Sequence, residues 1–348
     1  MRSIPRLLLL APPLLAAAPA TQPAATAQDM LSNGPFAAGS VDLVLHDSKR
    51  DKDLNIKVRY PQGAKGPLPV VIFSHGLGGS GEGFAELTAH WASRGYVVIL
   101  PTHSDSLALR KKAGQETPDL LAGPAALKSL LQPMDRLADV RFILDSFPAI
   151  EQRIDAPGQV AATRPVARLL DRDRIAMAGH SAGAFTTEMA LGVKLTNPLT
   201  GRQLTFAEPR IKAGILVSGQ GTATKTLAKD AWSDIALPMF VITGSLDTEP
   251  ITDETPESRQ EPFKFAKPGD KYLLFIDGAT HGSYGGKVMS GVLLEKPTTD
   301  VKVITDAVSA GTTAFLDAYL KSDAPAKACL LTDAIPKSSG GKATLNHK

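Results

Sequence analysis

Short runs of apolar residues recur along the chain, separated by longer segments with a helical pattern. Val70-Val71-Ile72-Phe73 is apolar at every position, which is typical of a strand buried on both faces of a sheet. Residues 40–46 and 54–60 come before it, with polar residues between them, and predict a hairpin. The other predicted strands share the short apolar pattern and lie at residues 96–100, 175–178, 211–217, 239–243 and 272–276.

Helices are predicted between these strands. In residues 134–147, the side chains of Leu137, Val140, Ile143 and Leu144 fall on one helical face. The other helical segments are residues 82–94, 182–194 and 301–320. Strands that alternate with helices of this length predict an α/β fold, with a mostly parallel central sheet and helices on both faces.

In such a sheet, ligands bind beyond the carboxyl ends of the strands. The candidate functional segments are those that follow strands, at residues 101–133, 218–237, 248–270 and 282–300. The long segments 148–173 and 194–210 follow helices and are expected on the opposite side. Trp232 and Tyr284 lie in strand-following segments, and for each of them packing is preferred to a role in the pocket.

Ser181 is the candidate nucleophile because of its place in Gly179-His180-Ser181-Ala182-Gly183, directly after the predicted strand 175–178. Gly-x-Ser-x-Gly between a strand and a helix is the pattern of a nucleophile elbow, which lifts the serine above the sheet edge. The turn strains the serine backbone, and the flanking glycines avoid clashes that side chains would cause. An ordinary glycine-rich turn also fits the pentapeptide. The presence of a histidine and an acid that could act with Ser181 decides between the two interpretations.

A serine hydroxyl becomes a good nucleophile when an imidazole takes its proton and a carboxylate orients that imidazole. The chain order expected with this turn is serine, acid, histidine. His281 follows Ser181 and lies in a loop directly after the predicted strand 272–276, so it is the candidate base. His347 lies near the end of the chain, and His180 is expected to point away from Ser181.

Asp247 is the candidate acid. It follows the predicted strand 239–243, which is the strand before the one that leads to His281. Asp277 is a rival, but its closeness in sequence to His281 favours a role in capping that loop. Asp253 and Glu249 are weaker rivals.

Two backbone N–H groups are the candidate donors to the oxyanion of a tetrahedral intermediate. Ala182 is the first, because it directly follows the nucleophile. Leu77 is the second, in the loop Ser74-His75-Gly76-Leu77-Gly78-Gly79 that follows a predicted strand. A loop rich in glycine lets the backbone approach a substrate closely, although a merely flexible loop has the same composition.

The first residues have the pattern of a secretory signal peptide. A short basic start precedes an apolar run from Leu7 to Ala20, and Ala18-Pro19-Ala20 and Ala25-Thr26-Ala27 both fit a small-x-small cleavage site. The predicted signal peptide is residues 1–27, and the predicted location is secreted or periplasmic. The apolar run is too short and too rich in proline for a stable membrane span.

The rest of the chain suits one large domain, expected at residues 28–328 as the catalytic domain. Residues 329–348 end in small and polar residues and are expected to form a flexible C-terminal tail. Cys329 is the single cysteine, which excludes a disulfide within the chain, and a structural or incidental role is preferred for it.

Composition and charge narrow the classes of partner. The chain is 43% apolar and 21% charged, as in globular proteins. Without residues 1–27 it has 36 basic and 35 acidic residues, and a near-neutral charge argues against a nucleic-acid partner. No group of histidines and cysteines has zinc spacing and no glycine-rich loop carries a phosphate-binding lysine, so neither a metal nor a cofactor is predicted.

Several of these segments together resemble a known family. They are Phe73–Gly79, Trp91–Val98, Pro101–Ser106, Asp135–Asp145 and Gly179–Phe185. Over roughly residues 40–320 the chain is similar to the branch of the α/β-hydrolases that contains platelet-activating-factor acetylhydrolases and relatives of dienelactone hydrolase. The resemblance implies an α/β-hydrolase fold and an esterase without a cofactor. It also implies a triad of Ser181, Asp247 and His281, with Leu77 and Ala182 as oxyanion donors.

The chain departs from its relatives at two positions. Ser181 stands where true dienelactone hydrolases have cysteine, so that activity is not expected. Ala182 stands where relatives often have phenylalanine, which would widen the floor of the pocket. Bacterial polyester hydrolases and chlorophyllases share the same core, so the fold does not decide the substrate.

The predicted function is that of a serine carboxylesterase that forms an acyl-enzyme. Its substrate is expected to be a small-molecule or lipid-like ester, in the manner of an acetylhydrolase, a lipase or a polyester hydrolase. Two alternatives stay open at this point. One is a serine peptidase or amidase with the same triad, and the other is a non-catalytic binding protein with the same fold.

Overall fold

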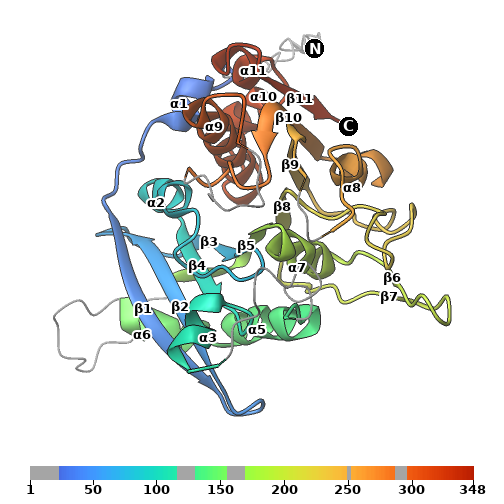
Figure 1. Cartoon of the computed structure of the whole chain (residues 1–348). Helices are drawn as coiled ribbons and strands as arrows, with labels where there is room; N and C mark the ends of the chain where they lie inside the picture. Colours follow the sequence, from blue (N-terminus) through green and yellow to red (C-terminus); the bar gives the residue numbers. More distant parts are fainter. Residues whose placement is uncertain (1–22, 116–129, 155–168, 249–251, 287–295) are drawn as a thin grey trace, which may run out of the picture.

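The structure is a computed structural model that describes residues 23–115, 130–154, 169–248, 252–286 and 296–348. Its centre is a nine-stranded sheet in the order β1-β2-β4-β3-β5-β8-β9-β10-β11 (Figure 1). The strands are β1 (Ala38–Asp47), β2 (Lys52–Pro61), β3 (Leu68–Ser74), β4 (Val97–Thr102), β5 (Leu170–His180), β8 (Ala213–Val217), β9 (Met239–Leu246), β10 (Lys271–Thr280) and β11 (Ala343–His347). Two short strands, β6 (Leu195–Thr196) and β7 (Gln203–Leu204), pair separately.

The six strands from β4 to β10 run parallel to their neighbours. The outer strands β1, β2 and β11 pair antiparallel. The mostly parallel sheet predicted from the sequence is therefore confirmed, and so are the hairpin and the predicted buried strands. β3 is buried along its whole length, as its unbroken apolar sequence predicted.

Helices cover both faces of the sheet, and alternate residues of each strand reach one face or the other. Val71 and Phe73 of β3 pack with Trp91 of α2 (Ala85–Ser93) and Phe315 of α9 (Val301–Leu320). On the other face, Ile72 packs in a second core with α5 (Pro133–Asp145) and α7 (Ala182–Leu191). Each large apolar side chain buried in this way contributes about 1.5–3 kcal/mol to stability.

Shorter helices complete the described chain. They are α1 (Ala27–Leu31), α3 (Leu107–Lys112), α6 (Phe147–Ile154), η2 (Ser258–Gln260), α8 (Glu261–Phe265), α10 (Ala324–Cys329) and α11 (Ala334–Ser338). None of the described helices has the length and apolar character needed to cross a membrane. α1, α9, α10, α11 and β11 gather at the top of Figure 1.

The prediction of a flexible tail at residues 329–348 is wrong. Cys329 ends α10 and is buried, α11 follows, and β11 pairs antiparallel with β10 through five residue pairs from Tyr272–His347 to Ile276–Ala343. Ile335 and Ala343 are buried against the core around α9, which gives this segment the apolar contacts that a tail lacks. The small residues that suggested mobility make a turn instead, and Gly341 has a φ of 80° there.

The predicted signal peptide lies mostly outside the described residues, which begin at residue 23. Its last residues are part of the fold. Thr26 caps α1 through a reciprocal pair of hydrogen bonds with Asp29, and Ala27 is the first residue of the helix and is buried. The folded unit therefore begins before residue 28, which was the predicted boundary of the domain.

Candidate active site

Four neighbouring parallel strands end directly before a polar residue. β5, β8, β9 and β10 end at residues 180, 217, 246 and 280, and the residues that follow are Ser181, Ser218, Asp247 and His281. These strands are neighbours in the sheet (Figure 1). Parallel strands bring their carboxyl ends to the same edge of a sheet, so the four residues that follow them lie along one edge. Each of the three predicted catalytic residues thus follows a strand, and all three lie at the carboxyl end of the sheet, as expected.

Ser181 occupies a strained turn between β5 and α7. Its φ of 54° and ψ of −118° form a combination that non-glycine residues rarely adopt and that costs about 1–3 kcal/mol. A side chain at Gly179 would overlap the backbone of Gly183, and one at Gly183 would overlap the carbonyl of Ser74. The predicted need for both glycines is confirmed, because the turn has no room for a Cβ at either position.

Asp247 and His281 are joined by a hydrogen bond. The distance from His281 Nδ1 to Asp247 Oδ1 is 3.0 Å, and the carboxyl group is fully buried. Asp247 Oδ2 also accepts hydrogen bonds from Thr243 Oγ1 at 2.9 Å and from the hydroxyl of Tyr284 at 2.8 Å. Tyr284 is buried, as packing predicted, but its hydroxyl binds the candidate acid, which the sequence did not reveal.

The rival acids have other positions. The side chain of Asp277 is 61% exposed and pairs with Lys342 at 3.1 Å. It also accepts a hydrogen bond from Ser245, whose Oγ accepts one from the Gly278 N–H, so Asp277 supports its own loop as predicted. Asp253 lines the cavity beside Ser181, and residue 249 lies outside the described residues.

A buried arginine keeps the candidate acid charged. Burial alone would raise the pKa of Asp247, but the Arg259 guanidinium, the hydrogen bond from His281 and that from Ser218 together lower it below its usual range. Arg259 Nε lies 3.2 Å from Asp247 Oδ1 and donates to the Asp247 carbonyl at 3.0 Å. The carboxylate is therefore ionised at neutral pH. Nothing in the sequence around Arg259 identified this role.

Ser218 is a further site residue that the sequence reading missed. Its hydroxyl donates to Asp247 Oδ1 at 2.7 Å and lies 2.7 Å from His281 Nδ1. These contacts assign a ring proton to Nδ1, shared between the two oxygens, so Nε2 of His281 is the nitrogen that can accept a proton. The signal was present in the sequence, because Ser218 directly follows the apolar run 211–217, as Asp247 and His281 follow theirs.

His180, which is expected to point away from Ser181, contacts His281. Its Nε2 lies 2.8 Å from the carbonyl oxygen of His281, and the two rings are 4.8 Å apart between centroids. His180 therefore contacts the loop that carries the candidate base. Trp232 is fully buried near Phe265, with ring centroids 6.3 Å apart, which agrees with the packing role predicted for it.

The predicted oxyanion donors border the same cavity as Ser181. Leu77 and Ala182 line a cavity of about 320 Å³ with Ser181, and Ala182 is the first residue of α7. Among the described residues, neither of the two N–H groups donates a backbone hydrogen bond. The other lining residues come mainly from three of the four segments predicted to be functional: Leu131, Gln220, Ala223, Thr224, Lys225, Thr226, Thr252 and Asp253.

A second set of serine, histidine and aspartate lies beneath the loop that follows β3. Ser74 Oγ is 2.9 Å from His103 Nε2, and His103 Nδ1 is 2.8 Å from Asp139 Oδ2. All three residues have no exposed surface. Arg50 and Lys52 both donate to Asp139 Oδ1, at 2.7 and 2.8 Å, and connect this set to the loop between β1 and β2.

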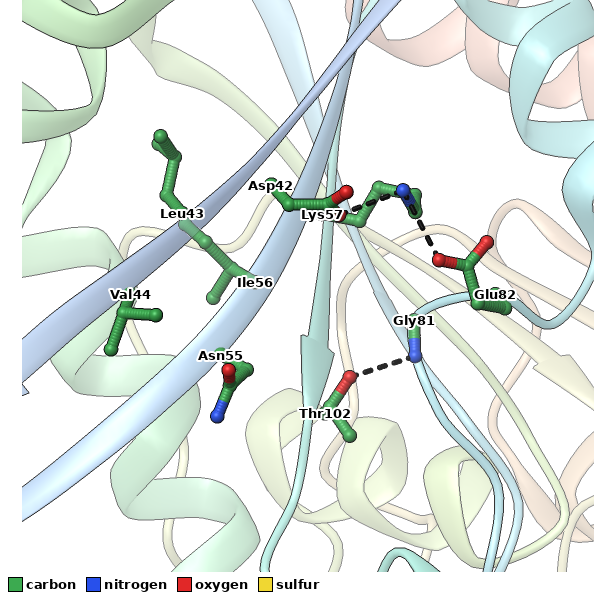
Figure 2. Close-up of a pocket in the computed structure, with 9 residues that line it drawn as sticks. All are labelled: Asp42, Leu43, Val44, Asn55, Ile56, Lys57, Gly81, Glu82 and Thr102. Atoms are coloured by element: carbon green, nitrogen blue, oxygen red, sulfur yellow. Dashed lines mark hydrogen bonds and ion pairs between the residues drawn. The ribbon is translucent and has the colours of Figure 1, made fainter. Parts of the chain in front are cut away.

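Another cavity, of about 180 Å³, lies beside the β1–β2 hairpin and is shown in Figure 2. Lys57 donates to Asp42 at 2.7 Å and pairs with Glu82 at 3.1 Å across it, and the Gly81 N–H donates to Thr102 Oγ1. None of the candidate catalytic residues lines this cavity. Within the described ranges, no group of three or more potential metal ligands was found.

Comparisons with known proteins identify similar sequences. A family model described as platelet-activating factor acetylhydrolase, isoform II, matches residues 33–123. The platelet-activating factor acetylhydrolase of Cavia porcellus is 22% identical over 278 residues, which cover 73% of this chain and 58% of that protein. The protein of the same name from Canis lupus familiaris is 23% identical over 285 residues, which cover 72% and 57%.

These matches confirm the predicted resemblance to the platelet-activating-factor acetylhydrolase branch of the α/β-hydrolases. The mostly parallel sheet with helices on both faces agrees with the α/β-hydrolase fold. The chain spans less than two thirds of the length of the curated relatives it matches, so its activity and substrates are matters for proposal.

Proposed function

We propose that the chain is a serine carboxylesterase with Ser181 as nucleophile, His281 as general base and Asp247 as the acid that orients it. The observation that carries the proposal is the buried hydrogen bond between Asp247 and His281, on the sheet edge where Ser181 occupies a strained turn. A buried carboxylate on Nδ1 of a histidine that follows a neighbouring strand is the arrangement that activates a serine.

The proposed reaction has two steps. Ser181 Oγ attacks the ester carbonyl carbon while His281 Nε2 takes the hydroxyl proton, and the N–H groups of Leu77 and Ala182 stabilise the oxyanion. His281 then gives the proton to the leaving alcohol, which leaves an acyl group on Ser181. In the second step His281 takes a proton from water, and the hydroxide attacks the carbonyl carbon of the acyl group. The bond from that carbon to Ser181 Oγ breaks, His281 returns the proton to Ser181 Oγ, and the carboxylic acid leaves.

Asp247 contributes through its charge. The imidazolium of His281 exists only while the proton is in transit, and an ionised carboxylate 3.0 Å from Nδ1 stabilises it. The lowered pKa of Asp247 keeps the carboxylate available at neutral pH. No resident cofactor or metal has a step in this mechanism.

The proposed substrate is a small-molecule or lipid-like ester. The cavity beside Ser181 has apolar walls at Leu77, Leu131 and Phe185, and its remaining lining is mostly short or polar side chains. The curated relatives carry the name acetylhydrolase, which supports acetyl esters as the first substrates to examine. Longer acyl chains and polyesters are the next classes, as for lipases and polyester hydrolases.

Hydrolysis of p-nitrophenyl acetate by Ser181→Ala tests the proposal. We expect the variant to lose turnover by about 10⁶-fold while its circular dichroism spectrum is unchanged. Ser245→Ala is the matched control, because its hydroxyl supports the Asp277 loop and it is expected to keep wild-type activity. Retained turnover in Ser181→Ala would overturn the proposal.

Two measurements decide between the proposal and its alternatives. Ester and peptide substrates with the same acyl group distinguish an esterase from a peptidase or amidase, and we expect the ester to be hydrolysed much faster. A fluorophosphonate probe is expected to label Ser181 in the wild type. Absence of labelling would favour a binding protein with the same fold.

We also propose that the chain is exported, with cleavage of its leader after Ala20 and not after Ala27. Cleavage after Ala27 would remove Thr26, which caps α1, and would also break the hydrogen bond from the Ala25 N–H to the carbonyl of Pro325. The intact mass of the protein recovered from the periplasm or the medium measures the new N-terminus. A mature chain that begins at Gln28 would contradict this assignment.

A further inference from the structure

The loop after β3 presents its backbone carbonyls to a buried arginine. Arg136 on α5 has only 1% of its surface exposed. One of its amino groups donates to the carbonyl of His75 at 2.7 Å, and the other donates to the carbonyl of Gly76 at 3.3 Å. Asp105 accepts a hydrogen bond from the second amino group at 2.6 Å, so the buried positive charge has a carboxylate partner.

The ring of His75 holds the carbonyl of Gly76 from another direction. Its Nε2 accepts a hydrogen bond from the His103 N–H at 3.0 Å, so the ring proton lies on Nδ1, which donates to the Gly76 carbonyl at 2.6 Å. Burial, followed by the charges of His103 and Arg136, lowers the pKa of His75 well below its usual range and keeps the ring neutral. The Gly79 N–H also donates to the Gly76 carbonyl, at 3.0 Å.

The direction of this carbonyl determines the direction of an amide hydrogen. The C=O and the N–H of a trans peptide point to opposite sides, and the Gly76–Leu77 peptide is trans. A Gly76 carbonyl held towards Arg136 therefore turns the Leu77 N–H to the other side. The loop passes Ser181, because a Cβ placed on Gly76 would lie 3.5 Å from the Ser181 Cβ. Leu77 borders the cavity that contains Ser181.

We propose that Arg136 is a positioning residue for the reaction. By holding the carbonyls of His75 and Gly76, it keeps the Leu77 N–H directed at the oxygen that becomes negative when Ser181 attacks the ester. The inference rests on the proposed function. Arg136 takes no part in bond making, and its effect is exerted through the peptide unit between Gly76 and Leu77.

Arginine is the side chain that suits this task. Its planar guanidinium carries five N–H donors in a fixed fork, so it can bind two carbonyls and the Asp105 carboxylate at the same time. Lysine has a compact ammonium that fits fewer of these acceptors, and methionine has no donor. Oxyanion donors accelerate a reaction because they are oriented before charge develops, so loss of orientation reduces kcat more than substrate binding.

The experiment compares Arg136→Met and Arg136→Lys with Arg141→Met. Arg141 is on the same helix, is partly exposed and donates to the Phe206 carbonyl at 2.8 Å, so it is a matched control for loss of an arginine. Each variant is assayed with p-nitrophenyl acetate and with the matching thionoacetate, in which sulfur replaces the carbonyl oxygen. Sulfur is a weak hydrogen-bond acceptor, so the thionoester gains little from oriented N–H donors.

We expect Arg136→Met to lower kcat for the oxygen ester about 10²-fold, with KM changed by less than about threefold. The ratio of oxygen-ester to thionoester turnover is expected to fall at least about tenfold, because only the oxygen ester depends on the donors. Arg136→Lys is expected to be intermediate in both measures, and Arg141→Met to match the wild type.

Two results would overturn the inference, namely a wild-type kcat in Arg136→Met or equal losses on the two esters. Equal losses are the result of a purely structural role, which lowers the amount of active protein for every substrate. If Arg136→Met does not fold, the ratio measured for Arg136→Lys decides in the same way. Turnover that survives in Ser181→Ala refutes the proposed function itself. If turnover depends on Ser181 but the ratio of oxygen-ester to thionoester turnover is unchanged in Arg136→Lys, only this inference is refuted.

Discussion

In the described part of the chain, two sets of serine, histidine and aspartate lie at the same end of the sheet, and the serine of one of them, Ser181, lines a cavity. In both, the histidine Nδ1 contacts a buried carboxylate, at 3.0 Å in His281–Asp247 and at 2.8 Å in His103–Asp139. Ser74 and His103 have no exposed surface and Ser74 ends a strand. Ser181 lines a cavity of about 320 Å³ and is held at a φ of 54°.

The difference separates a buried chain of hydrogen-bonded residues from a candidate active site of the same residue types. A reacting serine needs access for the substrate, a base that can take its proton and N–H donors beside it. Ser74 Oγ contacts His103 Nε2 at 2.9 Å and accepts a hydrogen bond from Arg136 at 3.3 Å, but with no exposed surface it offers a substrate no access. The buried set therefore connects the β3 loop to α5, and the set at the cavity is the candidate for catalysis.

Exchange of each histidine for glutamine is expected to separate the two roles most strongly. His281→Gln removes the proposed base and should lower kcat/KM for p-nitrophenyl acetate at least about 10⁴-fold with little change in Tm. His103→Gln breaks buried hydrogen bonds and should lower the free energy of unfolding by about 2 kcal/mol, with kcat/KM within about tenfold of wild type. The reverse pattern, activity lost only in His103→Gln, would exchange the two assignments.

Stability below pH 7 should distinguish the buried histidine. Burial, followed by the charge of Arg136, lowers the pKa of His103 well below its usual range. As the pH falls, His103 therefore takes up a proton in the unfolded chain before it does so in the folded protein. The contribution of neutral His103 to the free energy of unfolding is complete above pH 6.5 and is lost as the pH falls from there towards the pKa of the folded state. The loss is about 1.4 kcal/mol per pH unit for one proton.

Urea unfolding at pH 5, 6, 7 and 8 measures this contribution. Between pH 5 and 6.5, the free energy of unfolding should rise less steeply with pH in His103→Gln than in the wild type. The difference between the two slopes should correspond to the uptake of about one proton on unfolding. His75 is also buried with a lowered pKa, so part of the slope is expected to remain in the variant. Equal slopes in the two proteins would show that His103 takes up its proton in the folded state.

Tyr284→Phe is expected to have a smaller effect on the candidate active site. The ring is kept, and the hydrogen bond of 2.8 Å from its hydroxyl to Asp247 Oδ2 is lost. A hydrogen bond to a charged group contributes about 1.5–3 kcal/mol, so thermal unfolding should reveal a loss near the lower end of that range. We expect kcat to fall only severalfold, because His281, Ser218, Thr243 and Arg259 still hold the carboxylate.

Asp277→Asn should have the smallest effect. This side chain is mostly exposed and binds Lys342 and Ser245 at the surface, away from the hydrogen bonds of His281. Neither Tm nor kcat/KM is expected to change measurably. A large loss of activity in Asp277→Asn, together with an active Asp247→Asn, would make Asp277 the acid instead.

The strand-following positions of Ser181, Asp247 and His281 could be predicted because each is separated from a clear apolar run by only a few residues. Ser218 also follows an apolar run, but serine is common in turns, so this position alone does not distinguish it from an ordinary turn residue. Arg259 and Arg136 reach their partners through the tertiary fold, since Arg136 and Gly76 are 60 residues apart in the sequence. Such contacts leave no periodic pattern in the chain.

The C-terminal residues were misjudged for a related reason. The glycines and serines near residue 340 are typical of a mobile end, and the strand that follows them, Ala343–His347, is short and half polar. Its stability comes from pairing with β10 and from apolar contacts of Ala343, both of which depend on residues far away in the sequence. Composition describes a segment by itself and does not include the partner that it meets.

The pairing of β11 with β10 has a consequence for how the protein behaves in concentrated solution. β10 leads directly to His281, and without β11 its outer backbone groups would form an open edge. Open edges bind strands of other molecules and promote aggregation. β11 occupies that edge with a short strand flanked by Lys342 and Lys348, whose charges discourage further strand addition. β11 thus protects the strand that leads to the candidate base from intermolecular pairing.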